Sequence, residues 1–493
     1  MNYYIGIDLG TSSVKLMLTA KDGSIANTKS YEYPVRYPNP GWSEQSPEDW
    51  WDAVVKGIPE LIADIDVSCI KGIGVAGQMH GCVILDSSDS VIRPAILWND
   101  GRTAKQTEYL NMVIGEDKIS KYTANIAFAG FTAPKILWLR ECEPDNFSKI
   151  NKIMLPKDYI NYRLTGVHAC DYSDASGMLL LDVSNKCWSE EMLSLCGIDK
   201  KQMPQLFESF DCIGTVLPSV AKQLGLPDGV RVAAGAGDNA AAAIGTGTVG
   251  NGKCNISLGT SGTVFISSDS FTLPDSHAIH SFAHADGGFH LMGCILSAAS
   301  CNKWFCEQIL GTNDYASVEK TADLEKSAKN SLFFLPYLMG ERSPINDTDA
   351  TGMFIGLRPD TTRADMFTAV LEGVSFAIRD NMEIAKKLGI KIEESGICGG
   401  GSKSGLWKRM LSSVLNIRLC VPVSEEGPGY GGAILSMIAA GEYESVAECV
   451  GRFTSVSETV CPDEKLVPLY EEKYNKFKKV YPAVRQLYKD IKE

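Results

Sequence analysis

The chain of 493 residues lacks several features that mark whole classes of protein. Its fifteen cysteines include no C-x-x-C pair, so we expect reduced and mostly buried thiols rather than a disulfide framework. Basic residues are outnumbered, 47 against 60 acidic ones, and the net charge of −13 argues against a nucleic-acid partner. Although His280 and His284 are spaced as possible metal ligands, no HExxH pattern accompanies them, and we expect no zinc site there.

Long apolar runs are also absent. The longest uncharged stretch, Gly287 to Asn302, includes His, Ser and Asn and is too short to span a bilayer. No basic segment precedes Asp8, so we expect no signal peptide, a cytoplasmic location and no membrane partner. A chain of this length is too long for one compact core, and two or more domains are expected.

One short segment occurs twice, half a chain apart. Leu9-Gly10-Thr11-Ser12-Ser13 returns as Leu258-Gly259-Thr260-Ser261-Gly262, and each copy lies between two strand-like runs. Each therefore predicts a hairpin whose tip offers backbone N–H groups and hydroxyls without bulky side chains, which suits an oligophosphate. A polar turn explains one copy equally well. The second copy favours phosphate binding, with one nucleotide held between two lobes.

Strand and helix patterns alternate around these hairpins, which predicts an α/β core. Residues 70–76 read as a buried strand, and residues 47–62 and 363–388 read as amphipathic helices. The glycine-rich residues 245–252 form the best internal boundary, a hinge region between the halves.

Two aspartates stand at places where phosphoryl-transfer chemistry is possible. Asp8 precedes the first tip and could hold a magnesium ion, while Lys15 could return beside the phosphates. Asp238, in Gly237-Asp238-Asn239, could accept a proton from a substrate hydroxyl. The competing interpretation of Asp238 is an ordinary N-cap ahead of an alanine-rich helix.

Three further features have both a functional and a structural interpretation. Gly399-Gly400-Gly401 lets the backbone approach a flat ligand such as adenine, or simply forms a tight turn. His80, in Gln78-Met79-His80, could donate to a sugar hydroxyl or be a satisfied structural residue. The aromatic residues Trp98, Phe131 and Trp138 are expected in the core.

In this order, these motifs resemble the FGGY carbohydrate kinases of the actin, hexokinase and hsp70 superfamily. Two longer segments, Gly130 to Leu139 and Gly352 to Glu372, are similar to signature patterns of the family. Gln78-Met79-His80, Leu155 to Tyr159 and Gly340-Glu341-Arg342 resemble the branch that phosphorylates D-xylulose. The similarity is colinear over about residues 4–440.

The resemblance implies an α/β fold of two ribonuclease H-like lobes with five-stranded mixed sheets and an active-site cleft between them. Residues 1–249 would form the N-terminal, sugar-binding lobe with the catalytic aspartate, and residues 250–493 the ATP-binding lobe. It implies ATP and Mg²⁺ as cofactors and D-xylulose as substrate. Because dimers are common in the family, it also implies a homodimer. Ribulose, fuculose or a polyol as substrate, or a non-catalytic nucleotide- and sugar-binding protein, are the alternatives.

The resemblance also implies a role for each motif residue. Asp238 and Asp8 would be catalytic and would organise the metal, with Asp238 as proton acceptor. The sugar would contact Met79, His80, Asp238 and Asn239. ATP would be held by residues of both lobes, namely Thr11, Ser12, Lys15, Gly259, Thr260, Ser261, Gly400, Gly401 and Ser404.

Overall fold

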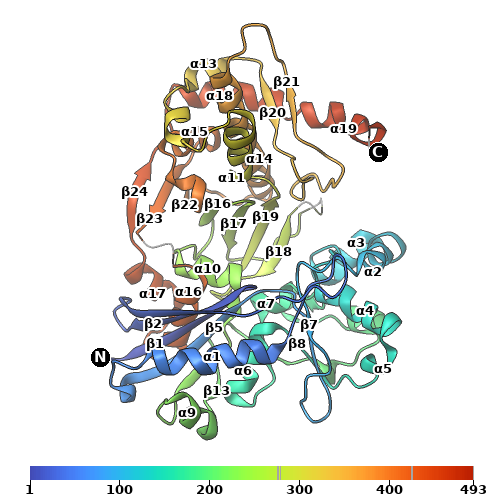
Figure 1. The fold of residues 1–493 in the computed structure, drawn as a ribbon, viewed down its shortest axis with the longest axis vertical. Helices are drawn as coiled ribbons and strands as arrows, with labels where there is room; N and C mark the ends of the chain where they lie inside the picture. Colours follow the sequence, from blue (N-terminus) through green and yellow to red (C-terminus); the bar gives the residue numbers. More distant parts are fainter. Residues whose placement is uncertain (275–276, 278, 424–425, 492–493) are drawn as a thin grey trace.

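Both predicted hairpins are present in the computed structural model, which describes residues 1–274, 277, 279–423 and 426–491. In the first half, β1 (Tyr3–Leu9) and β2 (Ser13–Ala20) pair antiparallel. In the second half, β16 (Cys254–Leu258) and β17 (Gly262–Ser268) pair in the same way. Each hairpin lies at the centre of a seven-stranded mixed sheet, and each sheet forms the core of one lobe (Figure 1).

The two sheets share one arrangement of strands. The first has the order β13-β14-β5-β1-β2-β3 with β15 also paired to β5, and the second β18-β19-β17-β16-β22-β23-β24. In each, two antiparallel strands flank the central strand on one side and two parallel strands on the other. This is the predicted five-stranded ribonuclease H-like core, which the edge strands widen to seven. The remaining sheet strands are β3 (Ile25–Glu32), β5 (Ile70–Gly77), β13 (Cys212–Thr215), β14 (Arg231–Ala233), β15 (Ala236–Gly237), β18 (His280–Ala283), β19 (Phe289–Ile295), β22 (Glu394–Cys398), β23 (Arg418–Pro422) and β24 (Val456–Val460).

Helices and short strands complete the first lobe. Helix α1 (Pro47–Leu61) begins with proline at its first position and buries its tryptophan- and valine-rich face against β2 and β3. Ser46 occupies the N-cap position of α1 but makes no side-chain capping bond. The other elements are η1 (Val67–Cys69), α2 (Ala104–Glu108), η2 (Tyr109–Gly115), α3 (Glu116–Thr123), α4 (Thr132–Cys142), α5 (Pro144–Phe147), α6 (Pro156–Thr165), α7 (Tyr172–Ser176), α8 (Glu190–Cys196), η3 (Lys200–Gln202), α9 (Pro218–Leu224), α10 (Asp238–Gly245), β4 (Glu44–Gln45), β6 (Val83–Leu85), β7 (Ala95–Ile96), β8 (Lys152–Met154), β9 (Ala169–Asp171), β10 (Leu181–Asp182), β11 (Cys187–Trp188) and β12 (Gln205–Phe207).

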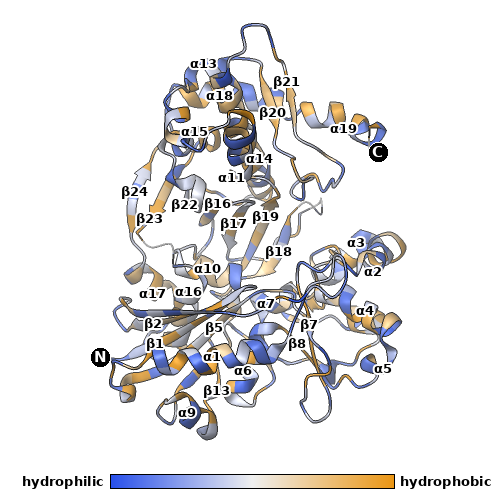
Figure 2. Ribbon diagram, viewed as in Figure 1, coloured by the Kyte–Doolittle hydropathy of each residue, from blue (hydrophilic) through white to orange (hydrophobic). Residues whose placement is uncertain are grey.

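The second lobe is organised around the long helix α14 (Arg363–Lys387), which the sequence predicts with nearly the same bounds. Thr362 and Asp365 form a capping box at its start. The C-terminal tail forms two helices, and the buried pair of Lys473 with Glu372 fixes the first of them to α14. The final helix, α19, has an amphipathic pattern of hydrophilic and hydrophobic turns (Figure 2). The elements of this part are α11 (Ala299–Trp304), η4 (Phe305–Ile309), α12 (Tyr315–Glu319), α13 (Leu324–Lys329), β20 (Phe333–Leu335), β21 (Met353–Ile355), η5 (Gly400–Lys403), α15 (Gly405–Leu415), α18 (Leu466–Phe477) and α19 (Val480–Asp490).

Two helices from the C-terminal half pack against the first sheet rather than the second. Helix α16 (Pro428–Ala439) lies directly on β1 and β5, and α17 (Val446–Phe453) packs beside it in the same core cluster (Figure 1). The contact is close because glycines face each other: a Cβ on Gly6 would lie 1.9 Å from the Gly429 carbonyl oxygen, and one on Gly74 2.0 Å from that of Gly432. The division at residues 249 and 250 separates the strands of the two sheets, but the first lobe also includes α16 and α17.

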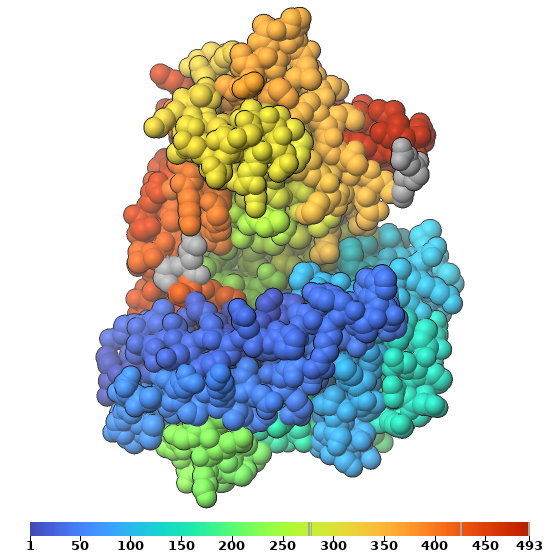
Figure 3. All heavy atoms as spheres, in the orientation of Figure 1, coloured from blue at the N-terminus to red at the C-terminus, as the bar shows by residue number. Residues whose placement is uncertain are grey.

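The two lobes are separated on one face by a recess between the blue lower lobe and the yellow and orange upper lobe (Figure 3). Within the described ranges, no helix has both the length and the apolar composition needed to cross a membrane.

The glycine contact under α16 can be tested by substitution. Gly6→Ala would place a methyl group against a backbone oxygen that cannot move aside, so we expect a loss of about 3 kcal/mol or more in urea unfolding. The control Gly451→Ala, in α17 with open space around it, should stabilise by about 0.5–1 kcal/mol because alanine favours helices. Wild-type stability of Gly6→Ala would contradict the packing.

Candidate active site between the lobes

Three parallel strands of the first lobe end together. Asp8 on β1 is opposite Ala76 on β5, which is opposite Ala236 on β15. The segments that follow these strands contain Gly10 and Thr11, Gln78 to His80, and Asp238, and they therefore emerge along one edge of the sheet. Ligands of open α/β sheets bind at this carboxyl edge. Asp238 follows at the start of α10 (Asp238–Gly245), close enough to Asp8 for the charge of Asp8 to raise its pKa.

The capping interpretation of Asp238 does not fit the geometry. Gly237 occupies the N-cap position of α10, and Asp238 is the first helical residue. Its carboxylate accepts hydrogen bonds from the backbone N–H and the side-chain Nδ2 of Asn239, at 2.7 and 3.1 Å. Burial and the charge of Asp8 raise the pKa of Asp238 to about 7. A half-buried carboxyl with this pKa is suited to accept a proton near neutral pH.

The surroundings of Asp8 fit a magnesium ion shared with phosphates. Burial raises the pKa of Asp8 to about 6, while the charge of Lys15 lowers it and that of Glu426 raises it. A cation beside Asp8 and Asp238 would offset the cost of ionising both. Among the described residues no group of three or more His, Cys, Asp or Glu side chains could hold a metal alone. Two carboxylates suffice for Mg²⁺, which keeps waters and takes phosphate oxygens as ligands.

Thr11 is fixed by residues of the first lobe. Its hydroxyl donates to Gln78 Oε1 at 3.1 Å and accepts from Trp98 Nε1 at 2.9 Å, while Gln45 Nε2 donates to its carbonyl at 2.6 Å. These bonds join the first hairpin tip to the loop that contains His80. The expectation that Trp98 lies in the core is wrong: its side chain is 47% exposed, whereas Phe131 and Trp138 are buried.

Lys15 lies beside Asp8, as the predicted role in phosphate binding requires, but its ammonium group forms an ion pair with Glu426. Glu426 immediately precedes the N-terminal end of α16, so the pair connects that helix to the hairpin. The sequence gives no sign of this partner, which is more than four hundred residues away. Ser12 at the same tip is exposed.

His80 adopts a strained backbone conformation that its surroundings hold in place. Its φ is 68°, in the left-handed region that a non-glycine residue rarely occupies. Its carbonyl accepts hydrogen bonds from Thr132 Oγ1 at 3.0 Å and from the buried Lys135 Nζ at 2.8 Å. Its ring stacks on Phe131 with centroids 4.6 Å apart. Such strain concentrates at functional sites, where the structure overrides the local preference.

The hydrogen bond of the His80 ring to the backbone determines which of its nitrogen atoms can accept a further bond. Burial lowers the pKa of His80 to about 3, so the ring is neutral. Nδ1 lies 2.6 Å from the Gly177 carbonyl oxygen, which can only accept, so Nδ1 has the proton and Nε2 has a free lone pair. The neighbouring Met79 packs against Gly177 and Gly237, which connects this loop to Asp238.

The second lobe repeats the same strand-end geometry. Ser257 on β16 is opposite Cys398 on β22, so Gly259 and Gly399 follow side by side. A Cβ on Gly399 would lie 2.8 Å from the Leu258 carbonyl group, so glycine is required there, and its φ is +85°. Thr260 and Ser261 are exposed at the tip of the hairpin.

A cavity of ≈ 730 Å³ opens beside these two turns. It groups five of the predicted ATP-binding residues, Gly259, Thr260, Gly400, Gly401 and Ser404. The Ser404 hydroxyl also caps α15 by accepting the Trp407 N–H at 3.0 Å. The sequence interpretation missed other lining residues, which come from α11 and α12 and have no motif of their own: Asn302, Lys303, Tyr315 and Glu319.

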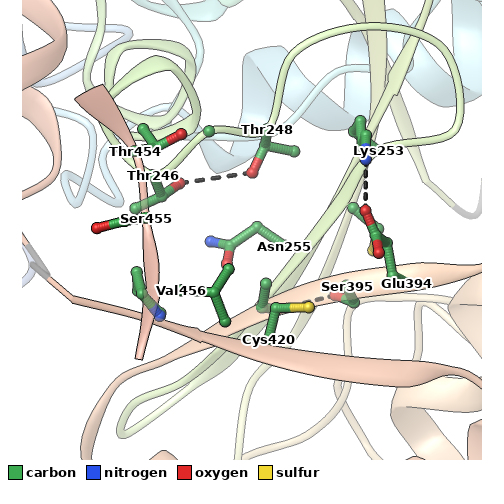
Figure 4. Close-up of a pocket in the computed structure, with 14 residues that line it drawn as sticks. Thr246, Thr248, Lys253, Asn255, Glu394, Ser395, Cys420, Thr454, Ser455 and Val456 are labelled. Atoms are coloured by element: carbon green, nitrogen blue, oxygen red, sulfur yellow. Dashed lines mark hydrogen bonds and ion pairs between the residues drawn. The ribbon is translucent and has the colours of Figure 1, made fainter. Parts of the chain in front are cut away.

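A smaller cavity of ≈ 200 Å³ lies at the predicted hinge (Figure 4). Thr246 and Thr248, which follow α10, line it together with Thr454 and Ser455, which follow α17. The chain thus passes between the sheets at more than one place: after α10, between β23 and α16, and between α17 and β24. The predicted hinge at residues 245–252 covers the first of these passages.

A buried lysine cluster supports the turn before Asp238. Lys157 is fully buried, and its Nζ lies 2.7 Å from Asp158, 3.0 Å from Asp171 and 3.9 Å from Asp174. It also donates to the Ala234 carbonyl at 3.2 Å. The three carboxylates keep the pKa of Lys157 well above its ordinary value despite burial, so the ammonium remains charged.

One serine connects the cluster to the turn before Asp238. Asp171 accepts from the Ser173 hydroxyl, at 2.5 Å, and Ser173 Oγ in turn accepts the Gly237 N–H at 3.2 Å. The residue before Asp238 is therefore held by hydrogen bonds that lead back to Lys157.

The fold and the site define a two-lobed sugar kinase, and the comparisons agree: the chain belongs to the FGGY family of carbohydrate kinases. The N-terminal domain of that family matches residues 3–245 and the C-terminal domain residues 254–440. The xylulose kinase of Escherichia coli K12 is 39% identical over 98% of this chain and 99% of its own.

Two solved structures extend the comparison. A xyloylose kinase from Brucella ovis superposes with a TM-score of 0.93 at 39% identity, covering 99% of this chain and all of the other. A gluconate kinase from Lactobacillus acidophilus gives the same TM-score of 0.93 at 26% identity, with complete coverage of both chains. Substrates therefore differ among proteins that share this whole fold.

The lysine cluster generates a stability prediction. Lys157→Met leaves three carboxyl groups buried without their cation, so we expect a loss of about 3–5 kcal/mol in urea unfolding. Lys222→Met, at an exposed position on α9, is the matched control and should change stability by less than about 0.5 kcal/mol. Equal stability of the two variants would contradict the role of Lys157.

Proposed function

We propose that the protein transfers the γ-phosphoryl group of ATP to the O5 hydroxyl of D-xylulose and releases D-xylulose 5-phosphate and ADP. One observation carries the proposal: Asp238, with a pKa of about 7, lies at the shared end of three strands beside the His80 loop and Asp8. The 39% identity to a xylulose kinase along nearly the whole chain supports the choice of sugar.

The positions of the residues suggest how the substrates are held. Asp238 and Asn239 border the sugar with Met79 and His80, all on the first lobe. The phosphates lie between the two hairpin tips, where Thr11, Ser12 and Lys15 face one side and Gly259, Thr260 and Ser261 the other. The adenosine occupies the cavity lined by Gly400, Gly401 and Ser404.

In the reaction, Asp238 accepts the proton of the O5 hydroxyl as the O5–P bond forms. The bond between the γ-phosphorus and the bridging oxygen breaks, and ADP leaves with that oxygen. Phosphoryl transfer has a loose transition state, so alignment of the hydroxyl contributes as much as its deprotonation. Closure of the lobes about the hinge would exclude water and prevent hydrolysis of ATP.

Asp8, with Asp238, would hold the magnesium ion that accompanies ATP. Bound there, Mg²⁺ would neutralise charge on the phosphate oxygens. The backbone N–H groups of the tips supply further stabilisation of that charge. The cytoplasmic location and the homodimer expected from the sequence stay predictions.

A substrate panel tests the proposed reaction. ADP release should be fastest with D-xylulose when compared with D-ribulose, L-fuculose, xylitol and gluconate, and absent without sugar. Faster ADP release with another sugar would identify that sugar as the substrate instead of D-xylulose. If none of the sugars in the panel stimulates ADP release, the non-catalytic alternative is favoured.

Asp238→Asn tests the base. Because positioned base catalysis supplies about 10²–10⁴ in rate, we expect kcat to fall by about 10² or more while ADP binding measured by calorimetry stays unchanged. The exposed Asp228→Asn is the matched control and should retain full activity. Near-normal turnover of Asp238→Asn would remove this carboxylate from the mechanism.

The raised pKa of Asp238 also predicts a pH effect on stability. The pKa is 3.8 ordinarily and about 7 in the folded protein, so stability is lost as the pH rises from about 4 to 7 and the carboxyl ionises. Without Mg²⁺ or nucleotide, Asp238→Asn should therefore raise Tm more at pH 8 than at pH 5. An equal change at both pH values would show that the folded pKa is not raised.

A further inference from the structure

The segment Gly340-Glu341-Arg342 has no role in the reaction described so far. It lies between β20 and β21 in the second lobe. The side chain of Arg342 extends to the first lobe, where its guanidinium carbon lies 5.4 Å from the ring centroid of Phe128. Arg342 therefore connects the two lobes on the side of the loop that contains His80.

The backbone under Arg342 is firmly anchored. Glu341 is almost fully buried, and its Oε1 accepts the Arg342 N–H at 2.8 Å and the Leu296 N–H at 2.9 Å. The next residue, Ser343, donates its N–H to the Cys294 carbonyl at 2.9 Å. The loop is thus fixed to the end of β19, and Arg342 projects from a rigid base.

The guanidinium group itself has no hydrogen-bond or ion-pair partner within the described part of the chain, although the residue is half-buried. An arginine has five N–H donors, and leaving them unused near apolar rings is costly unless a ligand takes them up. The positive charge acts on the His80 and His280 rings, whose pKa values it helps to lower.

An aromatic cluster places Arg342 next to His80. Phe128, under the guanidinium, lies 5.5 Å from Phe131, and Phe131 stacks on the His80 ring at 4.6 Å. His280 from the second lobe closes the cluster at 5.2 Å from Phe128. The donor Arg342 and the His80 ring, with its acceptor Nε2, therefore adjoin the same aromatic cluster.

The chemistry of the sugar explains why such a pair is useful. In the ring form of a 2-ketopentose, O5 is bonded to C2 and cannot receive a phosphoryl group. The reacting form is the open chain, which has a C2 carbonyl oxygen that only accepts hydrogen bonds. The adjacent C1 hydroxyl can donate. The unpaired donor Arg342 suits the C2 carbonyl oxygen, and the acceptor His80 Nε2 suits the C1 hydroxyl group.

We propose that Arg342 donates to the C2 carbonyl oxygen of the open-chain ketose while the C1 hydroxyl donates to His80 Nε2. This assignment rests on the proposed function and adds to it a residue that distinguishes ketoses from polyols. In this assignment, residues of both lobes form the sugar site. Arg342 and His80 bind the carbonyl end of the sugar, and the reacting hydroxyl lies at Asp238.

Ligands that differ at C1 and C2 test the assignment with variants of Arg342. A hydrogen bond from a charged donor contributes enough to change affinity by about 10- to 100-fold. In Arg342→Met we expect kcat/KM for D-xylulose and for 1-deoxy-D-xylulose, which keeps the carbonyl, to fall by that factor. The inhibition constant of xylitol, which lacks the carbonyl, should change by less than about 3-fold. Arg342→Lys should recover part of the loss.

Arg358→Met, at an exposed position in the same lobe, is the matched control and should leave every constant unchanged. ADP affinity should be unchanged in Arg342→Met, which separates a sugar contact from a folding defect. Equal losses for ketose and xylitol, or no loss for either, would overturn the assignment. If the wild-type protein phosphorylates no ketose, the proposed function fails instead, so the two failures are distinguishable.

Discussion

Strands β1, β5 and β15 run in the same direction, with Asp8 opposite Ala76 and Ala76 opposite Ala236. This register determines where each chemical group appears, since whatever follows the strands must emerge at one edge. A shift of one residue in any strand would turn its side chains to the opposite face. The glycine contacts between this sheet and α16 leave no room for such a shift. The positions of Asp238 and of the loop that contains His80 are therefore a consequence of the backbone packing beneath them.

Electrostatics at the site are arranged around anionic ligands in a protein of net charge −13. Burial and the charge of Asp8 keep the Asp238 pKa near 7, while Lys157 beneath the turn is held by its own carboxylates. Two cations near the site have defined contacts: Lys15 is paired with Glu426, and the Arg342 guanidinium of the second lobe lies over the Phe128 ring. The field of the whole protein repels a nucleotide, so local groups such as the backbone amides of the hairpin tips have to supply the attraction.

Much of the fold and site is predictable from the sequence because it is encoded locally. The hairpin tips, the strand before His80, the helix over residues 363–387 and the position of Asp238 at a strand-to-helix junction all follow from short patterns. Contacts between distant segments are not visible in this way. The pairing of Lys15 with Glu426, the return of α16 to the first sheet and the position of Arg342 over Phe128 depend on the assembled fold. The exposure of Trp98 and the bond from its indole N–H to Thr11, a residue 87 positions away, are likewise properties of the assembled fold.

The central claim is that a sugar hydroxyl reaches Asp238 while a nucleotide occupies the cavity beside Gly400 and Gly401. A crystal structure of the protein with D-xylulose, ADP and Mg²⁺ tests it most directly. The account predicts O5 within about 2.6–3.2 Å of an Asp238 carboxylate oxygen, and the β-phosphate between the two hairpin tips. A sugar bound with its reacting hydroxyl remote from Asp238, or a nucleotide outside that cavity, would contradict it.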